Sequence, residues 1–445
     1  MKKTTIGIVL LTLLAAGTLR AQESDITLSD KEIMKKGWNF GPLPVVGFDS
    51  DLGFQYGASC DIFNYGDGSR YPAYDYKMNV QASAYTKGSY VFRANGEIKS
   101  LIPDGKLFVD ACYLGAQKFE FFGFDGFAAY DPASNPVYTS TGTGTPLSDQ
   151  SAFNWMERNQ LRFLVSMQKK IAGHLNWTAG VAYYHTAARR IGLEAYADQT
   201  TLYELYRSSG LIGSTEADGG NVTHFKVGLT YDTRNHDSDP TRGVNIEGTL
   251  VAAPDIIDRD GFSNLGFTFS GAYYLPVWGE RITFAQRLVA QAKLCGKVPW
   301  YFTNNINSMF FTKLYTEGMG GNASVRGIHR NGVLADSYAW LNTEFRVRII
   351  DFRFINQNWT VALNPFTDWG KILTPYRLDE MEAAGLANYA VDDLKKAATA
   401  LHGTAGCGFK LIMNHNMVVS FEAAKALDER DGSGLWTNIG FNYLF

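Results

Sequence analysis

The residue best suited to chemistry in this sequence is Arg326, which lies in a glycine-rich stretch at residues 318–328. The stretch joins two strand-like runs, yet it is neither apolar nor short enough to be a tight turn. Its glycines, Gly320, Gly321 and Gly327, permit close approach to other backbone, and an arginine that leaves water needs a carboxylate partner. The pattern therefore predicts charge pairing that anchors a loop, rather than catalysis.

Carboxylates for this pairing follow in the next two runs. In the first run, apolar residues alternate with polar ones that include Glu344 and Arg346. In the second run, Val361 and Leu363 alternate with Phe366 and Asp368. Side chains in a strand point alternately to opposite faces, so the polar residues share a face that the loop can reach. We expect Asp368 to hold Arg326 as a structural pair with functional consequences. Glu344 and Arg346 either extend this network or are solvated charges.

A second polar group surrounds a predicted turn and consists of Asp232, Arg234, Pro240, Arg242 and Gly243. We interpret Asp232 and Arg234 as a pair that stabilises the turn rather than as a ligand site. Residues 236–239, His-Asp-Ser-Asp, superficially suggest metal ligands, but a polar turn explains them better. No metal site is predicted.

Compact catalytic motifs are absent from the sequence: it contains no His-Glu-x-x-His, Gly-x-Ser-x-Gly or Walker pattern. The glycine-rich residues 403–408 precede an apolar strand rather than a helix, so phosphate binding is not expected. The four cysteines are far apart and form no Cys-x-x-Cys pair, which favours small strand residues over a zinc site or disulfide. We expect neither enzymatic activity nor a cofactor, although a hydrolase assembled from neighbouring strands remains open.

Four features, in this order and spacing, resemble the BamA/TamA superfamily of outer-membrane barrels. They are Asp232-Thr233-Arg234 with Pro240-Thr241-Arg242-Gly243, then Val325-Arg326-Gly327, then Asn342-Thr343-Glu344-Phe345-Arg346, and finally Phe366-Thr367-Asp368-Trp369-Gly370. The resemblance implies that the sixth extracellular loop folds back into the lumen and that its Val-Arg-Gly arginine is held by the acid of the Phe-x-Asp-x-Gly strand. It also implies a mechanism without catalytic side chains, in which a weak seam and a thinned bilayer lower the barrier to insertion.

The elements that must position these residues are strands. From Trp38 onward, runs of roughly ten residues alternate apolar and polar, as in a transmembrane barrel. About sixteen such runs can be counted, and an even number places both termini on one side. Long inserts at residues 124–152, 194–221 and 378–401 then fall on the extracellular side. A soluble sandwich shows the same period, so we rely on the chain ends and the loop motif to predict an all-β, sixteen-stranded antiparallel barrel with an inward-folded extracellular loop.

The amino-terminal residues indicate export. Residues 1–21 have the charged end, apolar core and small final residue of a signal peptide. Residues 22–37 form a short periplasmic segment with capping-box spacing at Ser29 and Glu32, and the barrel occupies residues 38–445. The superfamily carries periplasmic POTRA domains before the barrel, for which this segment leaves no room. We therefore expect a periplasmic or lipoprotein partner to replace them.

The last run, residues 435–445, alternates to its end, with Phe441, Tyr443 and Phe445 on the apolar face and Gly440 on the other. This resembles the carboxy-terminal signal of outer-membrane barrels. We predict that it closes the barrel against the first run, residues 38–46. The prolines and glycines of that first run predict a short pairing.

The formal net charge of −3 excludes a global basic field that would attract nucleic acid. The predicted location is the outer membrane, in contact with its lipid. The predicted function is assembly, insertion or translocation of proteins, or of lipids, at that membrane, with clients that the sequence does not identify. The alternatives are a transport channel plugged by the Val-Arg-Gly loop and a structural barrel that anchors a partner.

Overall fold

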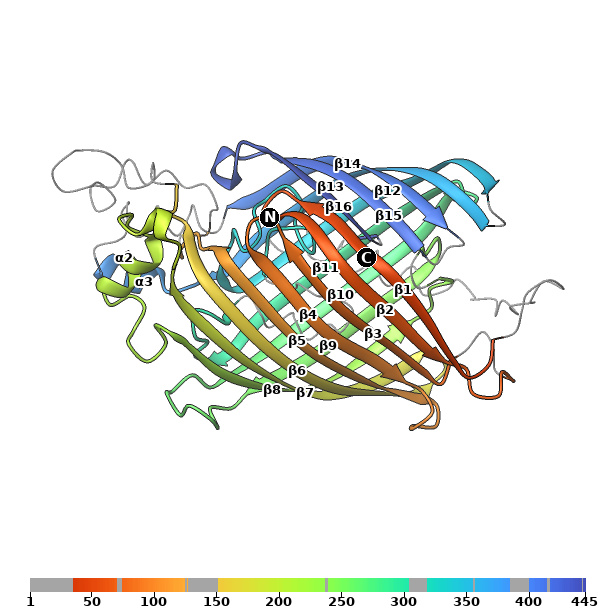
Figure 1. Cartoon of the computed structure of the whole chain (residues 1–445), viewed down its shortest axis with the longest axis horizontal. Coiled ribbons are helices and arrows are strands. Elements are labelled where there is room, and N and C mark those ends of the chain that lie inside the picture. Colours follow the sequence, from red (N-terminus) through yellow and green to blue (C-terminus); the bar gives the residue numbers. More distant parts are fainter. Residues whose placement is uncertain are drawn as a thin grey trace, which may run out of the picture. The chain divides into compact units, whose positions relative to one another are not determined.

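The computed structural model describes residues 35–445, except 70–73, 125, 127–150, 237–238, 304–317, 355–356, 385–399, 414–416 and 442. The predicted signal peptide and nearly all of the predicted periplasmic segment lie outside the described residues. Sixteen antiparallel strands form one closed barrel in chain order, with β16 returning to β1 (Figure 1). The predicted fold class is confirmed.

The strand bounds agree with the alternating runs. They are β1 (Trp38–Asp49), β2 (Gly53–Asn64), β3 (Tyr76–Tyr85), β4 (Ser89–Ile98), β5 (Gly105–Glu120), β6 (Trp155–Ala172), β7 (Leu175–Arg190), β8 (Gly219–Asp232), β9 (Gly243–Ala253), β10 (Asn264–Trp278), β11 (Ile282–Gly296), β12 (Ala335–Phe354), β13 (Gln357–Pro375), β14 (Leu401–Met413), β15 (Met417–Ala426) and β16 (Leu435–Phe441). Among the described residues, no helix is long and apolar enough to cross a membrane.

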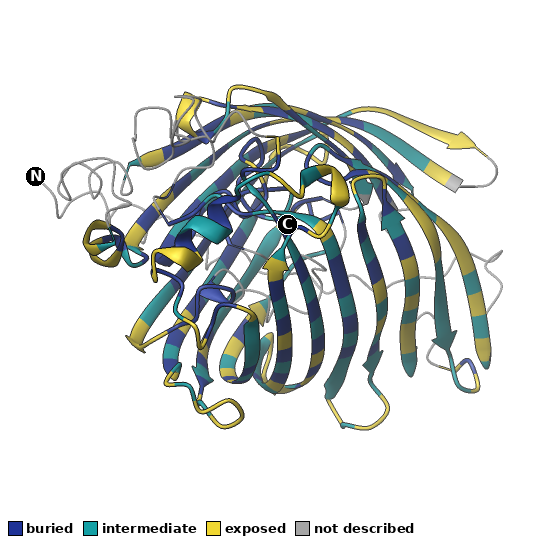
Figure 2. Cartoon of the chain, turned by 60° about the vertical axis from the view of Figure 1, so that its left-hand side comes forward, coloured by how far each residue is buried: buried dark blue, intermediate teal, exposed yellow. Residues whose placement is uncertain are grey.

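Alternation of side chains separates an apolar outer face from a polar inner face, and exposed and buried residues form bands along the strands (Figure 2). In β8, Val227 and Leu229 are 56% and 51% exposed, whereas the flanking Lys226 and Thr230 side chains are buried. The period of two in the sequence therefore sets which residues face outward and which face the lumen.

Two short helices form in the connections at one end of the barrel: α2 (Leu202–Ser208) follows β7, and α3 (Leu378–Ala383) follows β13 (Figure 1). Helix α2 begins with a capping box, in which Thr201 accepts from the Glu204 N–H and Glu204 accepts in return. These connections join odd strands to the following even strands, as the sequence predicts for extracellular loops.

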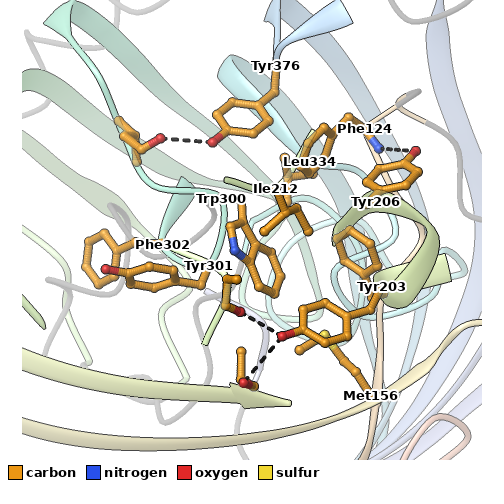
Figure 3. Packing of buried hydrophobic residues seen from close by; sticks show 14 of the residues in the cluster. Phe124, Met156, Tyr203, Tyr206, Ile212, Trp300, Tyr301, Phe302, Leu334 and Tyr376 are labelled. Atoms are coloured by element: carbon orange, nitrogen blue, oxygen red, sulfur yellow. Dashed lines mark hydrogen bonds between the residues drawn. The ribbon is translucent and has the colours of Figure 1, made fainter. Parts of the chain in front are cut away.

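The loops at this end share a hydrophobic core with the inner wall (Figure 3). Tyr203 of α2 donates through its hydroxyl to Ala217 O at 2.7 Å, and Tyr376 donates to Val298 O at 2.9 Å. Trp300 packs edge-on against Phe121, with ring centroids 5.3 Å apart. The loops are therefore packed together inside the barrel end.

The seam between the first and last strands differs from every neighbouring junction. Strand β1 pairs with β2 from Trp38 to Asp49, but within the described part of the chain it pairs with β16 only at Phe48↔Ile439 and Asp49↔Asn438. The predicted pairing of residues 38–46 with β16 is therefore wrong in position, although the pairing is short. Just beyond it, Ser50 N–H donates to Thr437 O at 3.1 Å.

The prolines of β1 explain where the pairing stops. Pro42 and Pro44 have the same strand parity as Ser50, so their backbone nitrogens face the position where β16 would lie. Proline has no N–H to donate to a ladder. From Trp38 to Gly47, this edge of β1 therefore has no strand partner among the residues that the structure describes.

The end of the chain leaves the wall and turns into the lumen. Strand β16 ends at Phe441, and Tyr443, Leu444 and the inner-wall residue Tyr274 are all about 5% exposed or less. The Arg346 guanidinium lies 3.9 Å from the Tyr443 ring centroid, and Arg346 Nη2 donates to Phe445 O at 2.7 Å. The predicted placement of Tyr443 and Phe445 on the apolar outer face is wrong, because inner-wall arginines bind both residues.

Candidate functional site

The connection from β11 to β12 is described at residues 297–303 and again from Gly318, and its second part folds into a compact hairpin. Met319 bridges Val333, and Gly321 N–H donates to Ile328 O at 2.8 Å. Gly320 adopts φ of 117°, and a Cβ there would collide with His329 O. Only glycine fits at this position.

Arg326 lies fully buried at the tip of this hairpin. Its Nε and Nη2 donate to the two carboxylate oxygens of Asp368 at 2.8 and 2.9 Å, and its backbone N–H donates to Asp368 Oδ2 at 3.0 Å. The guanidinium also lies 3.5 Å from the ring centroid of Phe366. Bidentate pairing combined with a cation–π contact requires the planar shape of arginine.

Two further carboxylates complete the network. Arg326 Nη1 lies 2.8 Å from Glu344 Oε1 and 2.9 Å from Glu422 Oε1. Glu344 also binds Arg346 Nε at 3.2 Å, and Glu422 binds Lys410 Nζ at 2.7 Å. The three carboxylates thus face three cations, which offsets the cost of burying all six charges.

The glycine of the Phe-x-Asp-x-Gly motif allows the hairpin to approach the wall. A Cβ at Gly370 would collide with Met319 Sδ. Nearby, Asn342 Nδ2 donates to Ser324 O at 2.7 Å, and Arg287 Nη2 donates to Ala323 O at 3.1 Å. The hairpin therefore lies against the inner faces of β11, β12 and β13.

The hairpin also reaches the first strand. Arg330 Nη2 lies 2.7 Å from Asp49 Oδ2, and Arg330 N–H donates to Asp51 Oδ2 at 2.8 Å. Asp49 is one of the two β1 residues that pair with β16. The loop is thus bound both to the stable wall and to the seam.

The residues predicted for the opposite turn lie together. Arg234 Nη2 and Asp232 Oδ2 are 2.7 Å apart, and Arg346 Nη1 donates to Pro240 O at 3.4 Å. Arg242 is exposed, and a Cβ at Gly243 would collide with Thr233 O. Of residues 236–239, positions 237 and 238 lie outside the described residues, and Asp239 pairs with Arg348 at 2.6 Å.

Sequence reasoning missed Glu422, Lys410 and Arg287. A usable signal exists for Glu422, because it alternates with the outward-facing Phe421 in β15 and therefore has inward parity. The contact of Arg330 with Asp49 has no comparable signal, since 281 positions separate the two residues.

Comparison with known proteins identifies the family of the chain and similar folds. Residues 115–422 match the Omp85 superfamily domain. The barrel is similar to BamA from Haemophilus ducreyi lacking POTRA domains 1–3, with a TM-score of 0.55 and 14% identity over 92% of this chain and 70% of that one. CdiB from Acinetobacter baumannii has a TM-score of 0.47 and 10% identity over 92% of this chain and 60% of that one. No curated protein matches in sequence. The family match covers more than half of the chain, which therefore belongs to the Omp85 superfamily.

Proposed function

We propose that this barrel assists the assembly, insertion or translocation of proteins at the outer membrane by opening between β1 and β16. The observation that carries the proposal is the seam itself, with two residue pairs between the strands. The neighbouring junction of β15 with β16 is paired continuously from Val419 to Lys425.

The energetics favour this junction as the place that opens. Each ladder hydrogen bond contributes about 0.5–1.5 kcal/mol net in water, and more where lipid offers no competing partner. Two residue pairs therefore hold the seam far less strongly than the other junctions. Opening it leaves the remaining strands paired.

The unpaired edge of β1 is also a suitable template for a client strand. From Trp38 to Gly47, the backbone groups of β1 that face away from β2 have no β16 partner among the described residues. Its side chains include the exposed Trp38, Phe40 and Leu43. An extended client segment can add to such an edge by main-chain hydrogen bonds, and its apolar side chains remain in lipid.

In this proposal the Arg326 network acts as a latch. It holds the hairpin against β12–β15, and the same hairpin contacts Asp49 through Arg330. The wall beside the seam is thereby supported while the seam opens.

The test is a disulfide across the seam. We replace Phe48 and Ile439, a directly opposed pair, by cysteine in a chain that lacks the four native cysteines. Oxidation is expected to abolish function in a strain that depends on the protein, measured as loss of other outer-membrane proteins from its proteome, and reductant should restore it.

The matched control is a cysteine pair at Val227 and Leu250, opposed outward-facing residues of the β8–β9 junction. Oxidation there should have no effect, because that junction remains closed throughout. Full activity with a quantitatively locked seam would remove the proposal and leave a transport channel or an anchoring barrel.

A further inference from the structure

Three side chains from distant segments meet at the loop-bearing end of the barrel. They are Asp51 in the β1–β2 turn, Glu120 at the end of β5 and His329 in the β11–β12 hairpin. His329 Nδ1 lies 2.9 Å from Asp51 Oδ1 and 3.7 Å from Glu120 Oε2. All three ligand atoms lie within 4.8 Å of one another.

This spacing suits a small divalent ion. Zinc binds nitrogen and carboxylate oxygen at roughly 2.0–2.2 Å, so two ligands in tetrahedral geometry lie about 3.3–3.6 Å apart. The two measured separations, 2.9 and 3.7 Å, lie on either side of that value. Side-chain rotations that bring all three atoms, now within 4.8 Å of one another, to this spacing would admit the ion.

One ligand atom is unsatisfied. Glu120 Oε2 is buried and has no hydrogen-bond partner among the described residues. The cations that face the cluster are engaged elsewhere: Arg330 Nη2 pairs with Asp49, and Lys87 Nζ donates to Ser50 O at 2.8 Å. Burying an acceptor without a partner is costly, and a bound cation would remove that cost.

The cluster is open on one side and preorganised on the others. The His329 side chain is 45% exposed, whereas Asp51 is only 2% exposed and Glu120 18%. The Phe122 ring lies 5.5 Å from the imidazole at an angle of 32°. Solvent therefore reaches the imidazole, while the Arg330 N–H holds the Asp51 carboxylate in place behind it.

The pKa values of all three groups are shifted by burial and by their mutual contacts. Burial by itself raises the pKa of Asp51, but the hydrogen bond and charge of His329 lower it below its ordinary value. Burial, together with the charge of Asp51, raises the pKa of Glu120 to about 7. Burial lowers the pKa of His329, but Asp51 and Glu120 raise it overall. An ion that binds Nδ1 displaces this proton, so its affinity should fall as the pH falls.

We propose that Asp51, Glu120 and His329 bind one divalent transition-metal ion of the zinc type, with water completing the coordination. Mixed imidazole and carboxylate ligands are typical of such ions. The ion would join the hairpin to the β1–β2 turn, two residues beyond the Asp49↔Asn438 pair of the seam. It would therefore hold the loop-bearing end of the seam independently of the Arg326 network.

The experiment titrates ZnCl₂ into the purified full-length barrel in detergent and measures heat. We expect one site, with affinity reduced at least about tenfold in His329→Gln and in Glu120→Gln. His174→Gln is the matched control, since His174 is an exposed histidine in the β6–β7 turn. Equal zinc affinity in the wild type and both cluster variants would overturn the proposal. Binding of Ca²⁺ or Mg²⁺ in place of zinc would overturn the assignment to a transition metal.

A second measurement needs no variant. Diethylpyrocarbonate modifies accessible histidines, and mass spectrometry reports the extent at each site. Zinc should protect His329 at least about tenfold and leave His174 unchanged, because direct coordination blocks Nδ1. Equal modification of His329 with and without zinc would contradict the proposal, whatever the variants do.

Discussion

At the scale of the residue, Arg326 is the charge on which the candidate site depends. It binds Asp368, Glu344 and Glu422 and is itself fully buried. Removing it leaves three carboxylates with two cations, Lys410 and Arg346, in a site from which water is excluded. The carboxylates must then take up protons or draw water into the wall.

We predict that Arg326→Ala lowers the free energy of unfolding by about 3–5 kcal/mol, because it breaks a buried ion pair. The heat-modifiable mobility of the folded barrel on gels measures this change as a lower midpoint temperature. The midpoint temperature of Arg326→Lys should lie between those of the wild type and Arg326→Ala, since lysine retains the charge without the bidentate geometry.

Arg430→Ala is the matched control for this change. Arg430 pairs with Asp428 at 2.6 Å in an exposed loop, where ion pairs contribute about 0–1 kcal/mol. If both alanine variants shift the midpoint equally, Arg326 does not anchor the loop.

At the scale of the element, the hairpin and the wall fit because Gly370 has no side chain. We predict that Gly370→Ala costs about 1–3 kcal/mol by overpacking against Met319. Limited proteolysis of the β11–β12 connection should become faster, because the hairpin is pushed off β13. Combining Gly370→Ala with Met319→Ala should relieve part of this effect.

Gly248→Ala in β9 is the comparison variant. A Cβ there meets the Phe267 ring at 3.7 Å, an ordinary contact, so no change in proteolysis is expected. Equal protection of the connection in Gly370→Ala and the wild type would mean that the hairpin does not need this close approach.

At the scale of the whole molecule, the hydrophobic core shared by the loops and the inner wall decides whether the barrel is an open channel. Trp300 is 3% exposed and donates through Nε1 to Glu216 O at 2.8 Å, which joins the β11–β12 and β7–β8 connections. Loops held together in this way favour a closed end and therefore oppose a steady open channel.

We predict that Trp300→Ala loosens this core and raises ion conductance in planar bilayers above the low level of the wild type. Truncating a buried tryptophan costs about 3–5 kcal/mol. Trp278→Ala is the control, since Trp278 is 70% exposed at the end of β10. A wild-type barrel that already conducts steadily, with no increase in Trp300→Ala, would favour the transport channel.

The sequence by itself determined the barrel and much of the latch. Side-chain direction along a strand is a local property with a period of two, so alternation was enough to place Glu344, Arg346 and Asp368 on the inner face. Glycine and proline are equally local in effect, which is why Pro42 and Pro44 predicted a short seam. In the structure these three side chains are buried, and β1 pairs with β16 at two residues.

Only the tertiary structure decided which groups meet once the barrel closes. Alternation in residues 435–445 is the same whether the segment stays in the wall or leaves it, so the inward turn at Tyr443 depended on Arg346 of β12. Likewise, Asp51, Glu120 and His329 have no mutual pattern in the chain. They come together because barrel closure and the inward fold of the hairpin bring the β1–β2 turn within hydrogen-bonding distance of a loop residue 278 positions away.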